Sequence, residues 1–123
     1  MKNRLNQAIE SSRKNGKKLF CAYLTLGYPN LNETKKMITA LDRAGTDILE
    51  LGFPFSDPLA DGRTIQAASE AVLRKGVCVR DAFKLVRTLR ADGLRITGLF
   101  FSYFNPIFHY GVEKFVNDAK ENG

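Results

Sequence analysis

Residues 46–62 read TDILELGFPFSDPLADG, a short apolar segment followed by a loop with two prolines and two glycines. Within Ile48–Leu51, apolar residues surround a single carboxylate, that of Glu50. Because side chains alternate between the two faces of a strand, Glu50 points away from Leu49 and Leu51. The stretch therefore predicts a strand with one apolar face, followed by a loop with turn chemistry.

The segments on either side alternate between strand and helix patterns. Residues 18–26 form a nearly continuous apolar run, typical of a strand buried within a parallel sheet, and residues 95–103 form a third such run. Apolar residues at helical spacing predict a helix over residues 2–14 and at least one helix after each strand. We expect Asn32 and Asp61 to cap the helices that follow them, since both residue types are good N-caps.

The predicted order is α–βα–βαα–βα, with residues 104–106 expected to form a turn before the last helix. Strands joined by helices imply parallel pairing with right-handed crossovers. Two α/β architectures satisfy this order: a doubly wound open sheet, or part of a (β/α)8 barrel, which needs about 250 residues. We expect residues 1–123 to be one domain that supplies three βα units, beginning near residues 18, 46 and 95.

Composition and charge exclude several classes of protein. Of the 123 residues, 44% are hydrophobic and 26% are charged, which excludes a disordered chain. No apolar run approaches the ~18 residues of a membrane span, and no signal peptide begins the chain. Six basic residues and one acidic residue lie within residues 1–18, so this N-terminal segment carries most of the net charge of +6. We therefore expect a cytoplasmic protein that binds neither nucleic acid nor membrane.

Glu50 and Asp61 flank the loop at the carboxyl end of the second predicted strand, where the active sites of parallel α/β proteins collect. If Glu50 faces the interior of a barrel, desolvation favours its protonated form, which suits general acid–base catalysis. Each residue also has a structural interpretation. Glu50 could be a partly exposed residue near a strand end, and Asp61 could serve only as a helix cap.

Residues 49–62, LELGFPFSDPLADG, together with Thr64–Gln66, closely resemble the signature of the tryptophan synthase alpha chain family. The segments TLGYP (25–29) and SYFNPI (102–107) resemble the first and third strand–loop segments of the same family. The resemblance implies a (β/α)8 TIM barrel, of which this chain supplies about the first three βα units. It also implies a carbon–carbon lyase of tryptophan biosynthesis that cleaves indole-3-glycerol phosphate to indole and glyceraldehyde 3-phosphate, with no metal and no cofactor in this chain.

Carried over by position, the resemblance makes Glu50 the acid–base residue and Asp61 the second catalytic carboxylate. Cleavage requires C3 of the indole to gain a proton while the side-chain hydroxyl loses one, and one mobile carboxyl could serve both steps. A fixed anion beside the ring N–H would stabilise the cation that forms on protonation of C3. Four positions match the walls of the indole pocket, although each could equally be plain barrel core: Tyr23, Ile65, Phe101 and Tyr103.

The resemblance also implies a partner, a β chain that carries pyridoxal phosphate and forms an α2β2 heterotetramer with this chain. The partner-facing positions are Pro54, Asp57, Pro58 and Asn105. Arg63 stands where the family usually has proline, which should loosen the loop slightly. The phosphate-binding loops of the family come from the last barrel units, so we expect the 123-residue chain alone to be inactive. The alternative is a truncated, non-catalytic fragment that acts only as an interaction module for the β chain.

Overall fold

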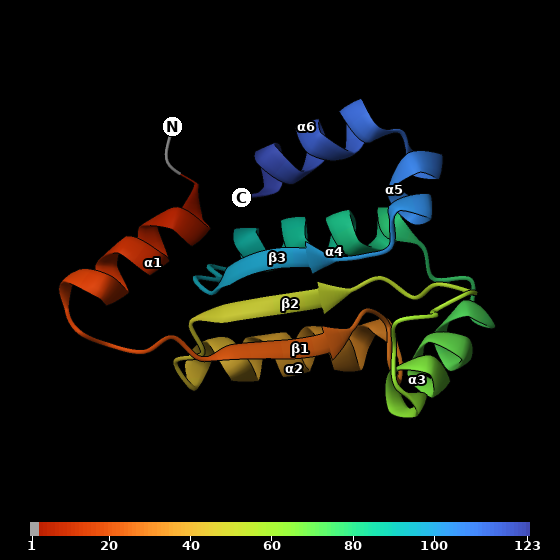
Figure 1. Cartoon of the computed structure of the whole chain (residues 1–123), viewed down its shortest axis with the longest axis horizontal. Helices are drawn as coiled ribbons and strands as arrows, with labels where there is room; N and C mark the ends of the chain where they lie inside the picture. The colour runs from red at the N-terminus through yellow and green to blue at the C-terminus, as the bar shows by residue number, and fades with distance from the viewer. Residues whose placement is uncertain (1–2) are drawn as a thin grey trace.

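A computed structural model describes residues 3–123, so Lys2, the first residue of the first predicted helix, lies outside the described residues. Three strands alternate with helices, in an order that differs from the prediction only by a second helix after the third strand (Figure 1). In chain order the elements are α1 (Arg4–Lys14), β1 (Cys21–Thr25), α2 (Leu31–Arg43), β2 (Ile48–Gly52), α3 (Arg63–Leu73), α4 (Val79–Ala91), β3 (Thr97–Phe101), α5 (Phe104–Tyr110) and α6 (Val112–Asn122).

The strands form one parallel sheet in the order β1-β2-β3. Their register places Tyr23, Glu50 and Leu99 side by side, one from each strand. At the carboxyl end, Gly52 lies between Thr25 and Phe101. Since all three strands point the same way, the loops that follow them gather at one edge of the sheet, as Figure 1 shows.

The two faces of the sheet have different surroundings. Leu49 and Leu51 belong to the apolar core that α2 and α4 complete, and both are almost fully buried. In Figure 1, α2 and α4 lie behind the strands, and no helix of residues 3–123 covers the face turned to the viewer. On that face Cys21 is exposed and Phe101 is 49% exposed, so the sheet has one covered face and one bare face.

Polar contacts hold the amino ends of the strands, at the edge opposite the loops. Asp47 Oδ2 accepts from the Phe20 N–H at 2.8 Å, just before β1. Asp42, near the end of α2, accepts from the N–H groups of Arg95 and Ile96 at 3.1 and 2.6 Å. The Arg90 guanidinium donates to the carbonyl oxygens of Leu94 and Ile96, both at 2.9 Å. These side-chain contacts fix where β1 and β3 begin.

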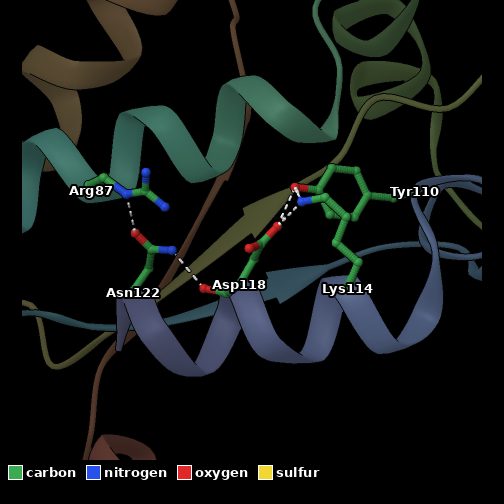
Figure 2. Close-up of polar contacts among 5 residues, drawn as sticks. All are labelled: Arg87, Tyr110, Lys114, Asp118 and Asn122. Carbon is green, nitrogen blue, oxygen red and sulfur yellow. Dashed lines mark hydrogen bonds and ion pairs between the residues drawn. The ribbon is translucent and has the colours of Figure 1, made fainter.

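A second polar network joins the last helices (Figure 2). The Tyr110 hydroxyl at the end of α5 donates to Asp118 of α6, and Lys114 donates to Asp118 Oδ2 at 2.6 Å and to the Tyr110 oxygen at 2.9 Å. The hydrogen bond from Lys114, followed by the one from Tyr110, lowers the pKa of Asp118. Asn122 accepts from Arg87 of α4 at 3.3 Å, so the network extends across three helices.

Three predictions about helix ends were wrong. Asn30, not Asn32, caps α2: its backbone is extended and its side chain accepts from the Glu33 N–H at 2.9 Å. Gly62, not Asp61, is the N-cap of α3. Residues 104–106 begin α5 instead of forming a turn, because a proline in the first turn of a helix lacks only an N–H that would have no helical partner.

Within residues 3–123, no helix combines the length and the apolar character that crossing a membrane requires.

Candidate active site

Glu50 lies at the centre of β2, on the bare face of the sheet, between Tyr23 of β1 and Leu99 of β3. Its side chain is half-buried. Among residues 3–123, no hydrogen bond or ion pair engages its carboxylate. The alternation of strand side chains therefore places a carboxylate without a fixed partner among apolar and aromatic neighbours.

Tyr23 leans from its own strand toward the carboxyl end of β2, where it lies against Gly52. A Cβ atom at Gly52 would lie 2.1 Å from the Tyr23 hydroxyl oxygen and 2.5 Å from Cζ, so any larger residue would displace the ring. Thr25 donates to the Tyr23 oxygen at 3.4 Å, and Phe101 meets the ring edge-on with centroids 5.9 Å apart. The absence of a side chain at Gly52 thus leaves room for the Tyr23 phenol on the bare face.

Both predicted carboxylates influence the Tyr23 hydroxyl. Burial raises the pKa of the Tyr23 hydroxyl, and the carboxylates of Asp61 and Glu50 raise it further. The hydrogen bond from Thr25 acts in the opposite direction. Burial and then Glu50 also raise the pKa of Cys21. Both carboxylates therefore act electrostatically on one hydroxyl, that of Tyr23.

Asp61 lies in the loop between β2 and α3. Its N–H donates to the Pro58 carbonyl at 3.0 Å, and its own carbonyl accepts from Gln66 Nε2 at 2.8 Å. Its carboxylate makes no hydrogen bond or ion pair with another residue of the described chain. Because Gly62 is the N-cap of α3, the side chain of Asp61 is not used in capping.

The four residues predicted to line an indole pocket are not equally placed. Phe101 touches Tyr23, and Tyr103 lies within electrostatic reach of the Tyr23 hydroxyl. Tyr103 also packs against Phe55, with ring centroids 5.1 Å apart. Ile65 and Tyr23 line a hollow of about 410 Å³ between β1, α2 and α3. The structure thus gathers three of the four around the carboxylates and places Ile65 at one side of Tyr23.

The predicted partner-facing residues also differ in exposure. Asp57 and Asn105 are exposed and line one hollow of about 320 Å³, whereas Pro58 is half-buried. Pro54 is buried, so it offers a partner the least surface of the four. The sequence analysis missed Leu59 and Phe104, which line the same hollow and are 92% and 63% exposed. An apolar residue at the tip of a Pro/Gly loop was the signal that could have found Leu59.

Arg63 is the first residue of α3, the helix position at which proline is favoured. Gln66 lies one turn further along α3, and its amide contacts the loop that carries Asp61. The sequence motif contains Gln66 but does not indicate this contact. In the part of the chain that the structure describes, no group of His, Cys, Asp and Glu side chains has the arrangement of a metal site.

Comparison with known proteins places this arrangement in a family. The family model described as "Tryptophan synthase alpha chain" matches residues 9–123. The tryptophan synthase alpha chain of Lachnospira eligens is 42% identical over 121 residues, which are 98% of this chain and 46% of that protein. That of Aquifex aeolicus is 41% identical over 120 residues, again 46% of its length. The chain thus spans about half the length of the curated relatives it matches.

Solved structures agree with the sequence comparison. Tryptophan synthase subunit alpha from Legionella pneumophila superposes with a TM-score of 0.95 at 36% identity, over 100% of this chain and 47% of that one. The aminoacrylate-bound tryptophan synthase from M. tuberculosis gives a TM-score of 0.89 at 39% identity, over 99% of this chain and 49% of that one. The fold is therefore the N-terminal portion of a (β/α)8 TIM barrel, not an open doubly wound sheet. On the match over residues 9–123, the chain belongs to the tryptophan synthase alpha chain family.

Proposed function

We propose that the complete protein is a cytoplasmic carbon–carbon lyase of tryptophan biosynthesis, which cleaves indole-3-glycerol phosphate to indole and glyceraldehyde 3-phosphate. One observation carries the proposal: Glu50 and Asp61, two carboxylates that no hydrogen bond or ion pair holds within residues 3–123, both act electrostatically on the Tyr23 hydroxyl, which lies against Gly52 at the carboxyl end of β2. Membership of the family supports this reaction, and in a TIM barrel this edge of the sheet carries the active site.

Glu50 is the proton carrier in this mechanism. Its protonated carboxyl delivers a proton to C3 of the indole, which leaves a positive charge on the ring nitrogen. The carboxylate then takes the proton of the side-chain hydroxyl, whose O–H electrons form the new carbonyl. The electrons of the breaking C–C bond return to the ring and neutralise the nitrogen. Since one proton is given and one taken, Glu50 ends as it began, and its lack of a fixed partner leaves it free to move between the two positions.

Asp61 stabilises the intermediate charge. A fixed anion beside the indole N–H lowers the barrier because the interaction strengthens only as the nitrogen becomes cationic. The carboxylate is available for this role because Gly62 takes over the capping of α3. Tyr23, Phe101 and Tyr103 supply the flat walls that an indole ring requires, and Ile65 closes one side.

We further propose a β-chain partner and an α2β2 assembly, with pyridoxal phosphate held by the partner and not by this chain. The loop after β2 and the start of α5 form the docking surface. Asp57 and Asn105 are exposed there beside the exposed apolar side chains of Leu59 and Phe104, a combination common at protein interfaces. The phosphate of the substrate is held by residues outside residues 1–123.

The test uses the full-length protein and an indole-release assay without the β chain. Asp61→Asn should lower kcat about 10²-fold while KM changes little, because its charge matters mainly in the transition state. Asp92→Asn is the matched control, since Asp92 forms an exposed ion pair with Lys35 and should leave both constants unchanged. A raised KM with unchanged kcat would make Asp61 a binding residue and contradict the mechanism.

The second candidate function is a non-catalytic interaction module for the β chain, favoured by the exposure of Leu59 and Phe104. It predicts that the wild-type protein releases no indole and still binds the β chain. Leu59→Ser should then weaken that binding, which titration calorimetry measures. Indole release by the wild-type protein would exclude this candidate as the whole function.

A further inference from the structure

The direction of the Asp61 side chain is set by its backbone. No hydrogen bond or ion pair holds the carboxylate itself within residues 3–123. The residue also lies outside regular structure, in the loop between β2 and α3, so neither a strand nor a helix fixes its peptide groups. Whatever contacts the backbone near Asp61 therefore decides where the carboxylate points.

Two side chains from different elements hold this backbone on either side of Asp61. Tyr103, directly after β3, accepts from the Ala60 N–H through its hydroxyl oxygen at 2.8 Å. Gln66, on α3, donates through its amide to the Asp61 carbonyl at 2.8 Å, and the same nitrogen lies 3.4 Å from the Pro58 carbonyl. The contacts fall on the Leu59–Ala60 peptide group, one residue before Asp61, and on the carbonyl that follows the Asp61 Cα.

Tyr103 is itself well placed for this contact. Its ring packs against Phe55 of the same loop, with centroids 5.1 Å apart and planes inclined by 31°. It also forms the N-cap of α5, so its backbone is continuous with β3 on one side and with a helix on the other. The hydroxyl is thus carried by a residue between a strand and a helix, and it reaches across to the loop between β2 and α3.

We propose that Tyr103 and Gln66 are positioning residues that together hold Asp61 in its catalytic direction; we name them the Asp61 clamp. The inference rests on the proposed function and adds to it, since Tyr103 entered the site above only as a wall of the indole pocket. A displacement of about 1 Å in a catalytic group can cost about 10²-fold in rate. Loss of one contact of the clamp should therefore lower kcat without weakening substrate binding.

The kinetic test uses full-length Tyr103→Phe, which keeps the ring and removes only the hydroxyl. We expect kcat for indole release to fall about tenfold, equivalent to about 1.4 kcal/mol, with KM within about twofold. Gln66→Met, which removes the amide at nearly constant length, should have a similar effect. In an Asp61→Asn background neither substitution should lower kcat further, because the group that they position has lost its charge.

The matched control is Tyr110→Phe, which also removes one tyrosine hydroxyl but acts on Asp118 of α6, as Figure 2 shows. It should leave kcat unchanged. A raised KM with unchanged kcat for Tyr103→Phe would overturn the proposal in favour of a pocket wall. An equal loss of kcat in the Asp61→Asn background would overturn it as well, because Tyr103 would then act independently of Asp61.

A second measurement does not depend on activity. Hydrogen exchange of the Ala60 amide should accelerate in Tyr103→Phe and stay at the wild-type rate in Tyr110→Phe. Unchanged exchange at Ala60 would show that the hydroxyl does not hold the loop, and would overturn the clamp. If the wild-type protein released no indole, the proposed function would fail, whereas faster exchange at Ala60 would still support the clamp. The two failures are therefore distinguishable.

Discussion

Leu49 and Glu50 are neighbours in β2 and yet belong to different environments. Leu49 enters the apolar core beneath α2 and α4, where it is 4% exposed. Glu50 lies on the bare face, beside the phenol of Tyr23 and within reach of the loop that carries Asp61. In one five-residue strand, alternate positions serve packing and the proposed chemistry. The difference teaches that stability and activity can be altered separately at adjacent residues of this protein.

The largest expected effect concerns the bare face as a whole. The 123-residue chain on its own should release no detectable indole, because the phosphate-binding part of the site lies outside it. We also expect it to self-associate, since Phe101 on this face is 49% exposed and, within residues 3–123, no strand pairs with the outer edge of β1 or of β3. Sedimentation velocity and an indole assay on the purified chain test both parts. A monomer that releases indole would contradict them.

Glu50→Gln in the full-length protein separates the two faces most directly. The amide keeps the shape of the side chain and cannot carry the proton, so we expect cleavage to fall by about 10² or more, with an unchanged Tm. Steady-state kinetics and calorimetry measure the two quantities on one preparation.

Leu51→Ala is the converse substitution, one residue away on the covered face, where Leu51 is 2% exposed. It should cost about 2–5 kcal/mol of unfolding free energy and leave kcat of the folded fraction near that of the wild type. If Glu50→Gln lowered stability as much as Leu51→Ala, or if Leu51→Ala lowered kcat as much as Glu50→Gln, the separation of the two faces would be wrong.

Gly52→Ala should have a smaller effect, confined to the bare face. The new methyl group would overlap the Tyr23 ring, and overpacking of this kind costs about 1–3 kcal/mol. Gly98→Ala is the matched control, because a Cβ there meets only one Arg90 nitrogen, at 3.9 Å. Urea unfolding of both variants measures the difference. Equal stability would mean that Tyr23 does not depend on Gly52 for its place.

The smallest expected effect lies away from both faces, in the network of Figure 2. The pKa of Asp118 is lowered in the folded protein, so its charge stabilises the fold above the unfolded pKa of about 3.9. This contribution is lost as the pH falls through the lower, folded value. Asp118→Asn should therefore lower Tm at pH 7 and have less effect near pH 3. A Tm difference that did not shrink with acid would assign the effect to packing.

Most of the fold could be predicted from the sequence because its signals are local. Apolar runs indicated three strands, and apolar residues at helical spacing indicated the helices that connect them. The errors arose at helix ends, where two neighbouring residues could each serve as the cap. Asn30 and Asn32 are both good caps, and only the backbone shows that the side chain of Asn30 accepts from Glu33.

The site was less predictable because its contacts join distant segments. The motif singled out Glu50 and Asp61, and the strand register accounts for the position of Glu50 beside Tyr23. The bond from the Ala60 N–H to Tyr103 links residues 43 positions apart and leaves no trace in any local pattern. The same holds for the place of Tyr23 against Gly52, which depends on the pairing of β1 with β2.

The polar contacts of Asp42, Asp47 and Arg90 at the amino ends of the strands have a consequence for engineering. They tie down β1 and β3 without using any residue of the loops at the opposite edge. Phe53 and Pro54 are buried, so sequence variation confined to residues 56–60 leaves the anchoring of these strands and the core intact. A library that randomises this loop and retains these anchors should yield mostly folded members, so new substrate preferences could be sought there without first adding stability.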